Sequence, residues 1–191
     1  MKASLVILSL TFCCVGCVPQ WTESSTADGT ADLTTLGAML ATAEYRGGGF
    51  VQMDPKPYES TLAPGSFITM YVSNAAAAAY STITPESMTG GDGFPVGGVV
   101  VREVSDAAGD VTQLTTVMKC KSGYNPTAGD LMFAVTDTNG QPVQVDGVSQ
   151  WGPLAECSSC HHGRASANYL FGVEESVRAA LVAHTTNSPA N

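Results

Sequence analysis

The feature that most constrains this chain is the pentapeptide Cys157-Ser158-Ser159-Cys160-His161. The spacing C-x-x-C-H is typical of a covalently attached c-type haem. Two thiols three positions apart can each add to a vinyl group of one porphyrin. The adjacent histidine is then held under the ring, where its imidazole ligates the iron. We therefore expect a haem c cofactor, with Cys157 and Cys160 in the thioether bonds and His161 as the iron ligand.

A C-x-x-C pair has other uses, and the residues alone leave two of them open. A zinc site would take its ligands from Cys157, Cys160, Cys120 and either His161 or His162. A redox dithiol or a disulfide is the second alternative. A redox motif usually opens a helix within a βαβ unit, and no such unit is visible in this sequence. Haem c is the leading interpretation because the adjacent histidine completes its motif.

The first residues carry an export signal. Lys2 gives a short basic start, and residues 3–12 form an apolar run that is too short to be a permanent membrane span. The run leads to Gly16-Cys17, which resembles a bacterial lipobox, although Cys14 stands where leucine is usual. We expect residues 1–16 to be a lipoprotein signal peptide and Cys17 to be the lipidated first residue. An ordinary secretory signal cleaved nearby is the alternative.

Either signal exports the chain, and lipidation would anchor it to a membrane in the periplasm or cell envelope. Attachment of haem c in bacteria also takes place outside the cytoplasm, so the two predictions support each other. Loss of residues 1–16 removes Lys2 and no acidic residue, which changes the net charge from −9 to −10. Such a chain is repelled by nucleic acid, whereas a basic redox partner protein would be attracted.

The rest of the chain suits one domain. Residues 17–31 are rich in Ser, Thr, Asp and Gly and are expected to form a flexible tether. Residues 32–187 are expected to form a single domain, because 44% apolar and 13% charged residues suffice for one packed core.

The pattern of residues predicts strands in the middle of this domain and helices at both ends. Helical spacing and turn residues place helices at 32–45, 75–80 and 174–183. Runs of β-branched and aromatic residues place strands at 67–72, 96–104, 114–119 and 131–136. Residues 50–65, 85–95 and 147–153 are expected to be loops. This order predicts an α+β domain, a mainly antiparallel sheet with flanking helices.

Several segments, taken in order, resemble one family. They are residues 67–74 with the alanines that follow, residues 93–97 with 99–104, residues 116–119, residues 128–134, and residues 157–161 with 168–171. Together they resemble the cytochrome P460 family, which includes the β-sheet cytochromes c′. The match covers residues 58–180, and the order of the segments makes it more specific than any segment besides C-x-x-C-H.

The resemblance implies a fold, a site and a class of ligand. The family fold is a mainly antiparallel sheet with flanking helices, commonly in a homodimer. The haem of the family is five-coordinate, with the C-x-x-C-H histidine on one side and an open face on the other. Known members bind nitric oxide or oxidise hydroxylamine. The resemblance therefore predicts a small gaseous or nitrogenous ligand, or electron transfer, for this chain.

Two positions depart from the hydroxylamine-oxidising members. Their cross-linking lysine aligns with Arg102, and a guanidinium stays protonated and is a poor nucleophile. Their distal glutamate aligns with Thr115, whose hydroxyl cannot take a proton at neutral pH. Whether the chain is an enzyme is therefore open. Hydroxylamine oxidation is the alternative function within the family, and a zinc-stapled envelope lipoprotein without a redox role is the alternative outside it.

Two candidate distal residues have competing interpretations. Arg102 shares a strand face with valines, so it either meets a haem propionate or bound anion, or lies at a strand end and reaches water. Phe133 either lines the haem or is part of the core. Five further residues are candidate ligands for which packing or solvent exposure is the simpler interpretation: Met70, Met118, Cys120, His162 and His184.

Overall fold

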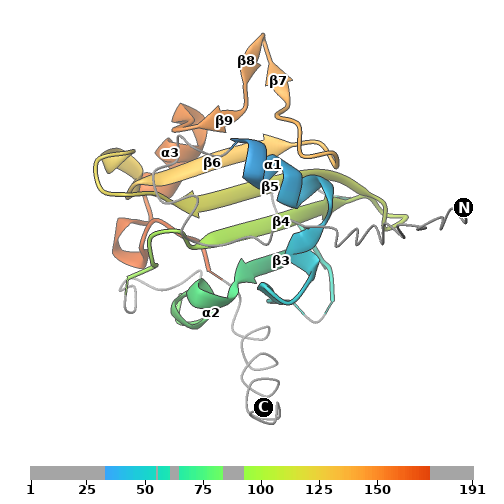
Figure 1. Ribbon diagram of the computed structural model, residues 1–191, viewed down its shortest axis with the longest axis horizontal. Helices are drawn as coiled ribbons and strands as arrows, with labels where there is room; N and C mark the ends of the chain where they lie inside the picture. The colour runs from blue at the N-terminus through green and yellow to red at the C-terminus, as the bar shows by residue number, and fades with distance from the viewer. Residues whose placement is uncertain (1–32, 55, 61–64, 84–92, 173–191) are drawn as a thin grey trace, which may run out of the picture.

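The structure is a computed structural model that describes residues 33–54, 56–60, 65–83 and 93–172. Its centre is a seven-stranded sheet in the order β1-β3-β4-β5-β6-β9, with β2 also paired to β3 (Figure 1). Every pairing is antiparallel. The strands of this sheet are β1 (Phe50–Gln52), β2 (Tyr58–Glu59), β3 (Phe67–Ser73), β4 (Val99–Ser105), β5 (Val111–Lys119), β6 (Leu131–Thr136) and β9 (Trp151–Gly152).

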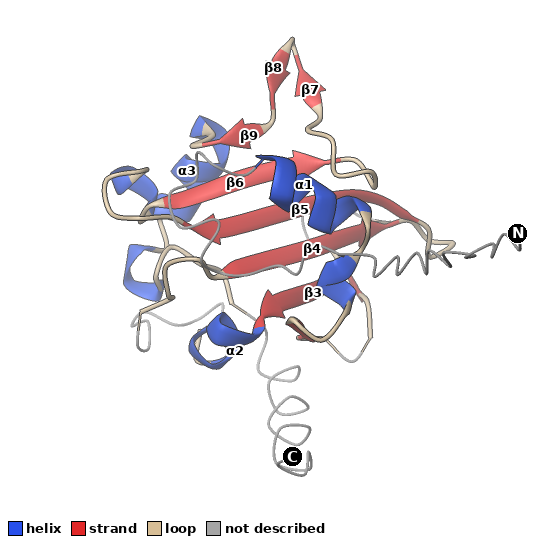
Figure 2. Cartoon of the chain, in the orientation of Figure 1, coloured by secondary structure: helices blue, strands red, loops and turns tan. Residues whose placement is uncertain are grey.

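Helices and one small hairpin surround the sheet. The α-helices are α1 (Leu33–Ala41), α2 (Asn74–Ser81) and α3 (Ala155–His162). Three short 3₁₀ helices are η2 (Glu44–Arg46), η3 (Pro126–Ala128) and η4 (Ala165–Ala167). Strands β7 (Gln144–Val145) and β8 (Val148–Ser149) form a hairpin that stands away from the sheet (Figure 2). The predicted α+β class, a mainly antiparallel sheet with flanking helices, is confirmed.

The two faces of the sheet carry separate cores. Alternate residues of a strand point to opposite faces, so each long strand contributes to both. On one face, which we call the α1 face, Leu36, Met39 and Leu40 of α1 pack against the centre of the sheet (Figure 1). The opposite face, which we call the α3 face, packs against α2 and the segments around α3. Its buried strand residues are Met70, Val72, Val100, Leu131 and Phe133.

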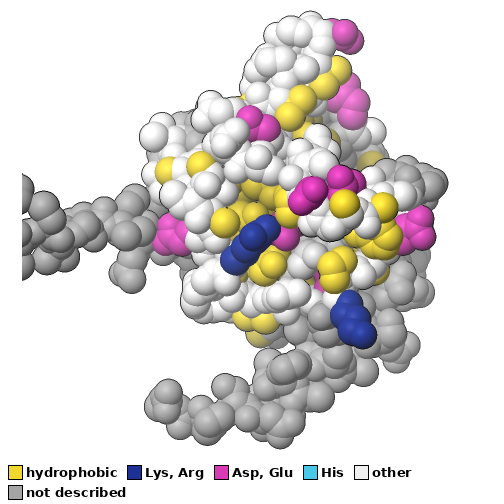
Figure 3. Space-filling view, turned by 90° about the vertical axis from the view of Figure 1, so that its right-hand side faces the viewer, with side chains coloured by type: hydrophobic (Ala, Val, Ile, Leu, Met, Phe, Trp, Pro, Cys, Tyr) yellow, Lys and Arg dark blue, Asp and Glu magenta, His cyan; other side chains and the backbone are white. Residues whose placement is uncertain are grey.

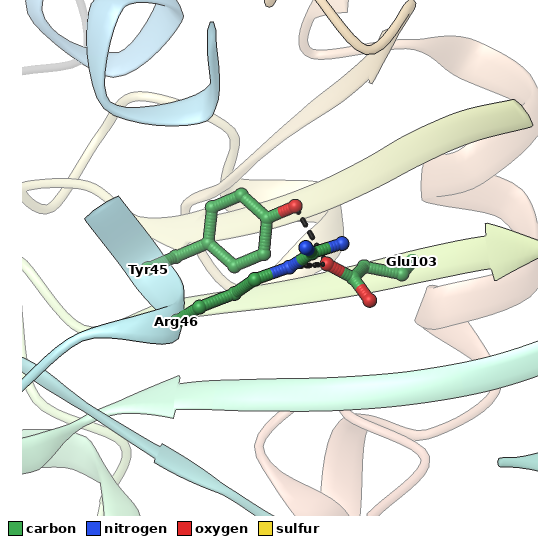
Figure 4. A network of polar contacts seen from close by, with 3 residues as sticks. All are labelled: Tyr45, Arg46 and Glu103. Atoms are coloured by element: carbon green, nitrogen blue, oxygen red, sulfur yellow. Dashed lines mark hydrogen bonds and ion pairs between the residues drawn. The ribbon is translucent and has the colours of Figure 1, made fainter. Parts of the chain in front are cut away.

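A buried carboxylate on the α1 face binds two side chains of η2. Glu103 of β4 is 5% exposed and accepts a hydrogen bond from the Tyr45 hydroxyl at 2.7 Å. It also accepts from Arg46 Nε at 2.5 Å in an ion pair (Figure 4). Burial, and after it the hydrogen bond to Glu103, raise the pKa of Tyr45, so its hydroxyl stays protonated and donates. The contact ties η2 to the middle of the sheet.

The predicted strands are present, with shifted ends. Residues 131–136 form β6 as predicted, and β3 extends the predicted strand by one residue to Ser73. Strand β4 begins at Val99 instead of Val96, because Gly97 has a positive φ of 84° and Gly98 lies too close to Phe94 for a side chain. Strand β5 begins at Val111, three residues before the predicted start.

Other predictions need correction. The first helix ends at Ala41 instead of Tyr45, because Ala43 adopts a left-handed φ of 52° before η2. Residues 50–65 and 147–153 were predicted as loops, but they contain the short strands β1, β2, β8 and β9. Helix α2 begins at Asn74, one residue before the predicted start, and the Asn74 side chain donates a hydrogen bond to the Gly48 carbonyl.

Some predictions fall on other parts of the chain. The signal peptide, Cys17, the tether and the helix at 174–183 lie outside the described residues. None of the helices within the described ranges is long and apolar enough to cross a bilayer.

Candidate functional site

The C-x-x-C-H motif lies on α3, which directly follows β9. Cys157 and Cys160 are one helical turn apart, so their side chains lie on the same side of the helix. Cys157 is half-buried and packs against the core of the α3 face, whereas Cys160 is exposed. Both thiols are free. The helix therefore presents one thiol at the edge of the apolar core and the other to solvent beside it.

Side-chain hydrogen bonds hold α3 in place. Buried Asn125 donates from Nδ2 to Ser158 Oγ at 3.0 Å and to the Leu131 carbonyl at 2.9 Å. Thr127 Oγ1 donates to Asn125 Oδ1 at 3.0 Å. The Thr127 carbonyl lies 2.7 Å from Nδ1 of His162, which is exposed as expected. The helix is thus attached to the turn that leads into β6, and its position follows that of the sheet.

The imidazole of His161 is held by the backbone and by two aromatic rings. Its Nδ1 lies 2.5 Å from the Tyr169 carbonyl oxygen. A carbonyl only accepts, so Nδ1 carries the proton and donates, and Nε2 is left with its lone pair. The ring centroid is 4.8 Å from that of Phe133 and 5.0 Å from that of Phe171. Histidines that ligate a metal through Nε2 have this tautomer, and their Nδ1–H commonly donates to a backbone carbonyl in the same way.

An unusual backbone turn aims the Tyr169 carbonyl at the histidine. Asn168 and Tyr169 both have positive φ, 54° and 60°. Such conformations are uncommon for residues with a side chain and often mark functional sites. Gly129 lies against the Tyr169 ring so closely that a Cβ at this position would overlap it. The turn therefore depends on a glycine 40 positions away in the chain.

The electrostatics of the site favour a neutral imidazole at His161 and a protonated thiol at Cys157. Burial lowers the pKa of His161, and the charge of Arg102 lowers it further, against the effect of the Tyr169 hydrogen bond. Neutral imidazole is the form that binds metals. Burial, with the Glu156 charge, raises the pKa of Cys157. A redox dithiol needs the opposite shift, so the site gives that alternative no support.

Arg102 and Thr115, two of the three candidate distal residues, face each other. They are direct partners in the antiparallel pairing of β4 and β5, and their side chains point to the α3 face. Both side chains are partly buried, yet Arg102 Nε and Thr115 Oγ1 are shielded atoms without a hydrogen-bond partner. Arg102 is in the middle of β4, so the interpretation that it lies at a strand end is wrong.

Phe133 is part of the core and also contacts the motif histidine. It is 3% exposed and belongs to the core of the α3 face, and its ring also lies against His161. Of the two methionines considered as ligands, Met70 is in the same core, whereas Met118 packs on the α1 face. Cys120 is buried on the α1 face as well, and His184 lies outside the described residues.

Two further observations bear on where a ligand binds. Within the described residues, His, Cys, Asp and Glu side chains do not gather in a group of three or more that would hold a metal ion, so the zinc alternative gains no support. A hollow of about 330 Å³ opens on the α1 face, away from α3. Its lining is Leu40, Ala41, Ala43, Tyr45, Arg46, Val111, Leu114 and Thr138. The surface seen from the right-hand side of Figure 1 carries hydrophobic, acidic and basic side chains (Figure 3).

The sequence did not point to the residues that hold His161. Asn125, Gly129 and Tyr169 are ordinary loop residues when read in order, and only the fold brings them to α3. Gly129 and Tyr169 lie within two of the segments that resemble the family, 128–134 and 168–171, but the sequence alone indicates no role for either residue. Comparison with known proteins finds no protein-family model and no curated protein that matches this chain.

Proposed function

We propose that this chain is an exported mono-haem c-type cytochrome of the P460 type. Its haem would bind a small ligand such as nitric oxide at an open iron position or transfer electrons. The observation that carries the proposal is the contact between His161 Nδ1 and the Tyr169 carbonyl. It fixes the motif histidine with Nε2 available, as a haem ligand requires.

The surroundings of the motif fit this cofactor. Cys157 at the core edge and Cys160 beside it would carry the two thioethers, and both are free thiols. When bound, haem iron supplies a coordination position for diatomic ligands and one-electron chemistry. Phe133 and Phe171 pack on the imidazole and shield part of it, while the Tyr169 carbonyl raises its basicity by accepting a hydrogen bond from Nδ1–H.

The placement of the methionines favours an open iron position. A sixth ligand would have to come from the α3 face, where His161 lies. Met118 packs on the α1 face and is therefore a poor candidate, which leaves Met70 of the two considered. Met70 is 3% exposed and packed within the core, and methionine in a strand is usually a packing residue.

The proposal extends to fold and location. The antiparallel sheet, with α1 on one face and α3 on the other, is compatible with the cytochrome P460 fold that the sequence resembles. We place the protein in the periplasm or cell envelope, anchored through Cys17. Its partners would be a small gaseous or nitrogenous ligand and a redox protein, and homodimers are expected from the resemblance.

The first experiment is to express the chain in a host that matures c-type cytochromes. The pyridine haemochrome spectrum should be that of haem c, and the colour should survive acid–acetone extraction. The ferrous protein should bind carbon monoxide and nitric oxide. Cys157→Ala with Cys160→Ala is the matched variant, and it should abolish covalent attachment. A colourless wild-type protein would refute the proposal, and a low-spin spectrum unaffected by either gas would refute the open iron position.

A further inference from the structure

The α3 face contains a charged residue, Arg102, whose Nε has no hydrogen-bond partner among the described residues. Arg102 is in the middle of the central strand β4, and its Nε is shielded from water without an acceptor. Among the described residues, no carboxylate forms an ion pair with it. Directly opposite on β5, Thr115 Oγ1 is shielded and unpartnered too. Two neighbouring donors thus lack acceptors at the same place on the sheet.

The adjacent charged residue, Glu103, has partners within the fold, unlike Arg102. Glu103 is next to Arg102 in the chain but points to the α1 face, where Tyr45 and Arg46 both donate to it. Leaving a buried polar group without a partner costs free energy, and proteins rarely leave one unpaired. Within the described ranges, Arg102 and Thr115 therefore lack the acceptor that Glu103 provides on the other face, and a molecule bound to the α3 face would supply one.

The position of Arg102 relates it to the motif histidine. Its charge acts on both His161 of α3 and Tyr80 of α2, so the guanidinium lies on the face that these helices cover. Phe133, which contacts His161, is two strands away and displaced by two residues, on the order of 10 Å across and 7 Å along the sheet. His161, which would hold the haem, and Arg102 therefore lie on the same face of the sheet.

We propose that Arg102 and Thr115 form an anion-binding subsite on the α3 face, which takes a carboxylate or a small oxyanion. This inference rests on the proposed haem function. Guanidinium presents a planar fork of N–H donors that fits such groups, and the threonine hydroxyl adds one more donor. Both residues are partly exposed as a whole, although Arg102 Nε and Thr115 Oγ1 themselves are shielded. The anion is either a propionate of the bound haem or a free ion such as nitrite.

The test compares haem-loaded variants with matched controls. Arg102→Gln removes the charge, and Lys121→Gln removes a charge from an exposed position. Thr115→Val removes the hydroxyl. Thr116→Val is its control, because Thr116 Oγ1 is also shielded and unpartnered but lies on the α1 face of the same strand. The measurements are the Kd of the ferric protein for nitrite, fluoride and neutral imidazole, and the reduction potential.

Either source of the anion gives a distinct result. For a free ion, Arg102→Gln should raise the Kd for nitrite and fluoride about tenfold or more, with imidazole binding unchanged. For a propionate, Arg102→Gln should leave these Kd values unchanged and lower the reduction potential below that of Lys121→Gln, because a compensating positive charge is lost. Thr115→Val should have a smaller effect of the same sign. It should raise the Kd for nitrite and fluoride if the anion is a free ion, or lower the reduction potential if the anion is a propionate.

The proposal is overturned if Arg102→Gln matches Lys121→Gln and Thr115→Val matches Thr116→Val in every measurement. If Arg102→Gln does not fold, the threonine pair decides alone, since it changes no charge. A wild-type protein without covalent haem would refute the proposed function and the subsite with it. A wild-type haem protein with silent variants would refute the subsite alone, so the two failures are distinguishable.

Discussion

At the scale of single residues, each face of the sheet has one polar side chain held by hydrogen bonds, Glu103 on the α1 face and His161 on the α3 face. It is a buried carboxylate with two donors, Tyr45 from the end of the first helical region and Arg46 next to it. Arg46 is half exposed, so solvent weakens its ion pair. The Tyr45 hydroxyl, by contrast, is buried and is the better shielded of the two donors.

We expect Tyr45→Phe to lower the free energy of unfolding by about 1.5–3 kcal/mol, as for other hydrogen bonds to charged groups. Chemical denaturation measures this change. Tyr124→Phe is the control, because the Tyr124 hydroxyl is half-buried and has no hydrogen-bond partner among the described residues. Equal losses in the two variants would show that the contact with Glu103 contributes nothing to stability.

Arg102 and Thr115 also lead to a prediction about catalysis. Hydroxylamine oxidation needs a proton acceptor near the iron-bound nitrogen, and neither residue accepts a proton at neutral pH. The wild-type protein should therefore show little oxidation of hydroxylamine, and peptide mass spectrometry should find two thioethers and no third bond to haem. Rapid turnover with an artificial electron acceptor would contradict this expectation.

The reverse substitutions test the same positions. Arg102→Lys should permit a third covalent bond to the haem, detected by mass spectrometry. Adding Thr115→Glu should raise the rate of hydroxylamine oxidation about a hundredfold or more, because the two positions face each other on one side of the sheet. Thr116→Glu, on the other side, is the control and should give no gain. No third bond in Arg102→Lys would mean that this position does not reach the porphyrin edge.

The motif residues were predictable one by one, and their supports were not. C-x-x-C-H is local, so its chemistry can be inferred from five consecutive letters. Tyr45 and Glu103 are 58 positions apart, and Asn125 and Ser158 are 33 apart, so nothing in their neighbourhoods signals the contact. The family resemblance indicates Thr115 and Arg102 as distal candidates. That the two residues face each other depends on the register of β4 and β5, which the sequence does not show.

At the scale of elements, long strands were predictable and short ones were not. Residues 131–136 form a strand because their own β-branched and aromatic residues favour it. Strands β1, β2 and β9 have two or three residues each, and β3 or β6 supplies their hydrogen bonds. Pairing with a neighbour determines such strands, so the intrinsic preference of three residues gives no reliable signal.

The turn between η3 and β6 links these elements to the site. Gly129 and Gly123 both have positive φ, 62° and 95°, but only Gly129 contacts the Tyr169 ring. Gly129→Ala should therefore lose about 1–3 kcal/mol more stability than Gly123→Ala, because it adds the overlap to the same backbone strain. Thermal denaturation of both variants measures the difference.

The same pair of variants reports on the histidine. Displacing Tyr169 would move the carbonyl that accepts from His161 Nδ1. The haem-loaded Gly129→Ala protein should show an altered ferric absorption spectrum, whereas Gly123→Ala should retain that of the wild type. Identical spectra would mean that the position of Tyr169 does not control the imidazole.

At the scale of the whole molecule, the predicted class was confirmed because the order of elements determines it. Strands in bulk with helices at the ends leave few packings, and an antiparallel sheet covered by helices is the common one. The assignment of residues to two faces was harder. Val96 was expected to share a strand face with Arg102, but it precedes β4 and is 49% exposed. Glycine contacts within the turn set that boundary, and these arise only in the folded chain.

The folded domain is expected to be joined to its lipid anchor by the predicted tether, residues 17–31. Residues 17–31, if flexible, would have a root-mean-square span of roughly 20 Å, which keeps the domain near a membrane yet free to turn toward a redox partner. The prediction depends on Cys17 as the lipidated residue. Cys17→Ser should release the haem protein into the soluble exported fraction, as measured by fractionation and absorbance.

Cys13→Ser is the matched control, because it removes a cysteine from the same apolar region without changing the residue after Gly16. It should leave the protein in the membrane fraction with the N-terminal mass of a lipidated Cys17. Release of Cys17→Ser alone would separate the anchor from general damage to the signal, because damage to the signal would retain both variants in the cytoplasm without haem. A wild-type protein that is already soluble, or that begins at another residue, would show that the signal is an ordinary secretory one.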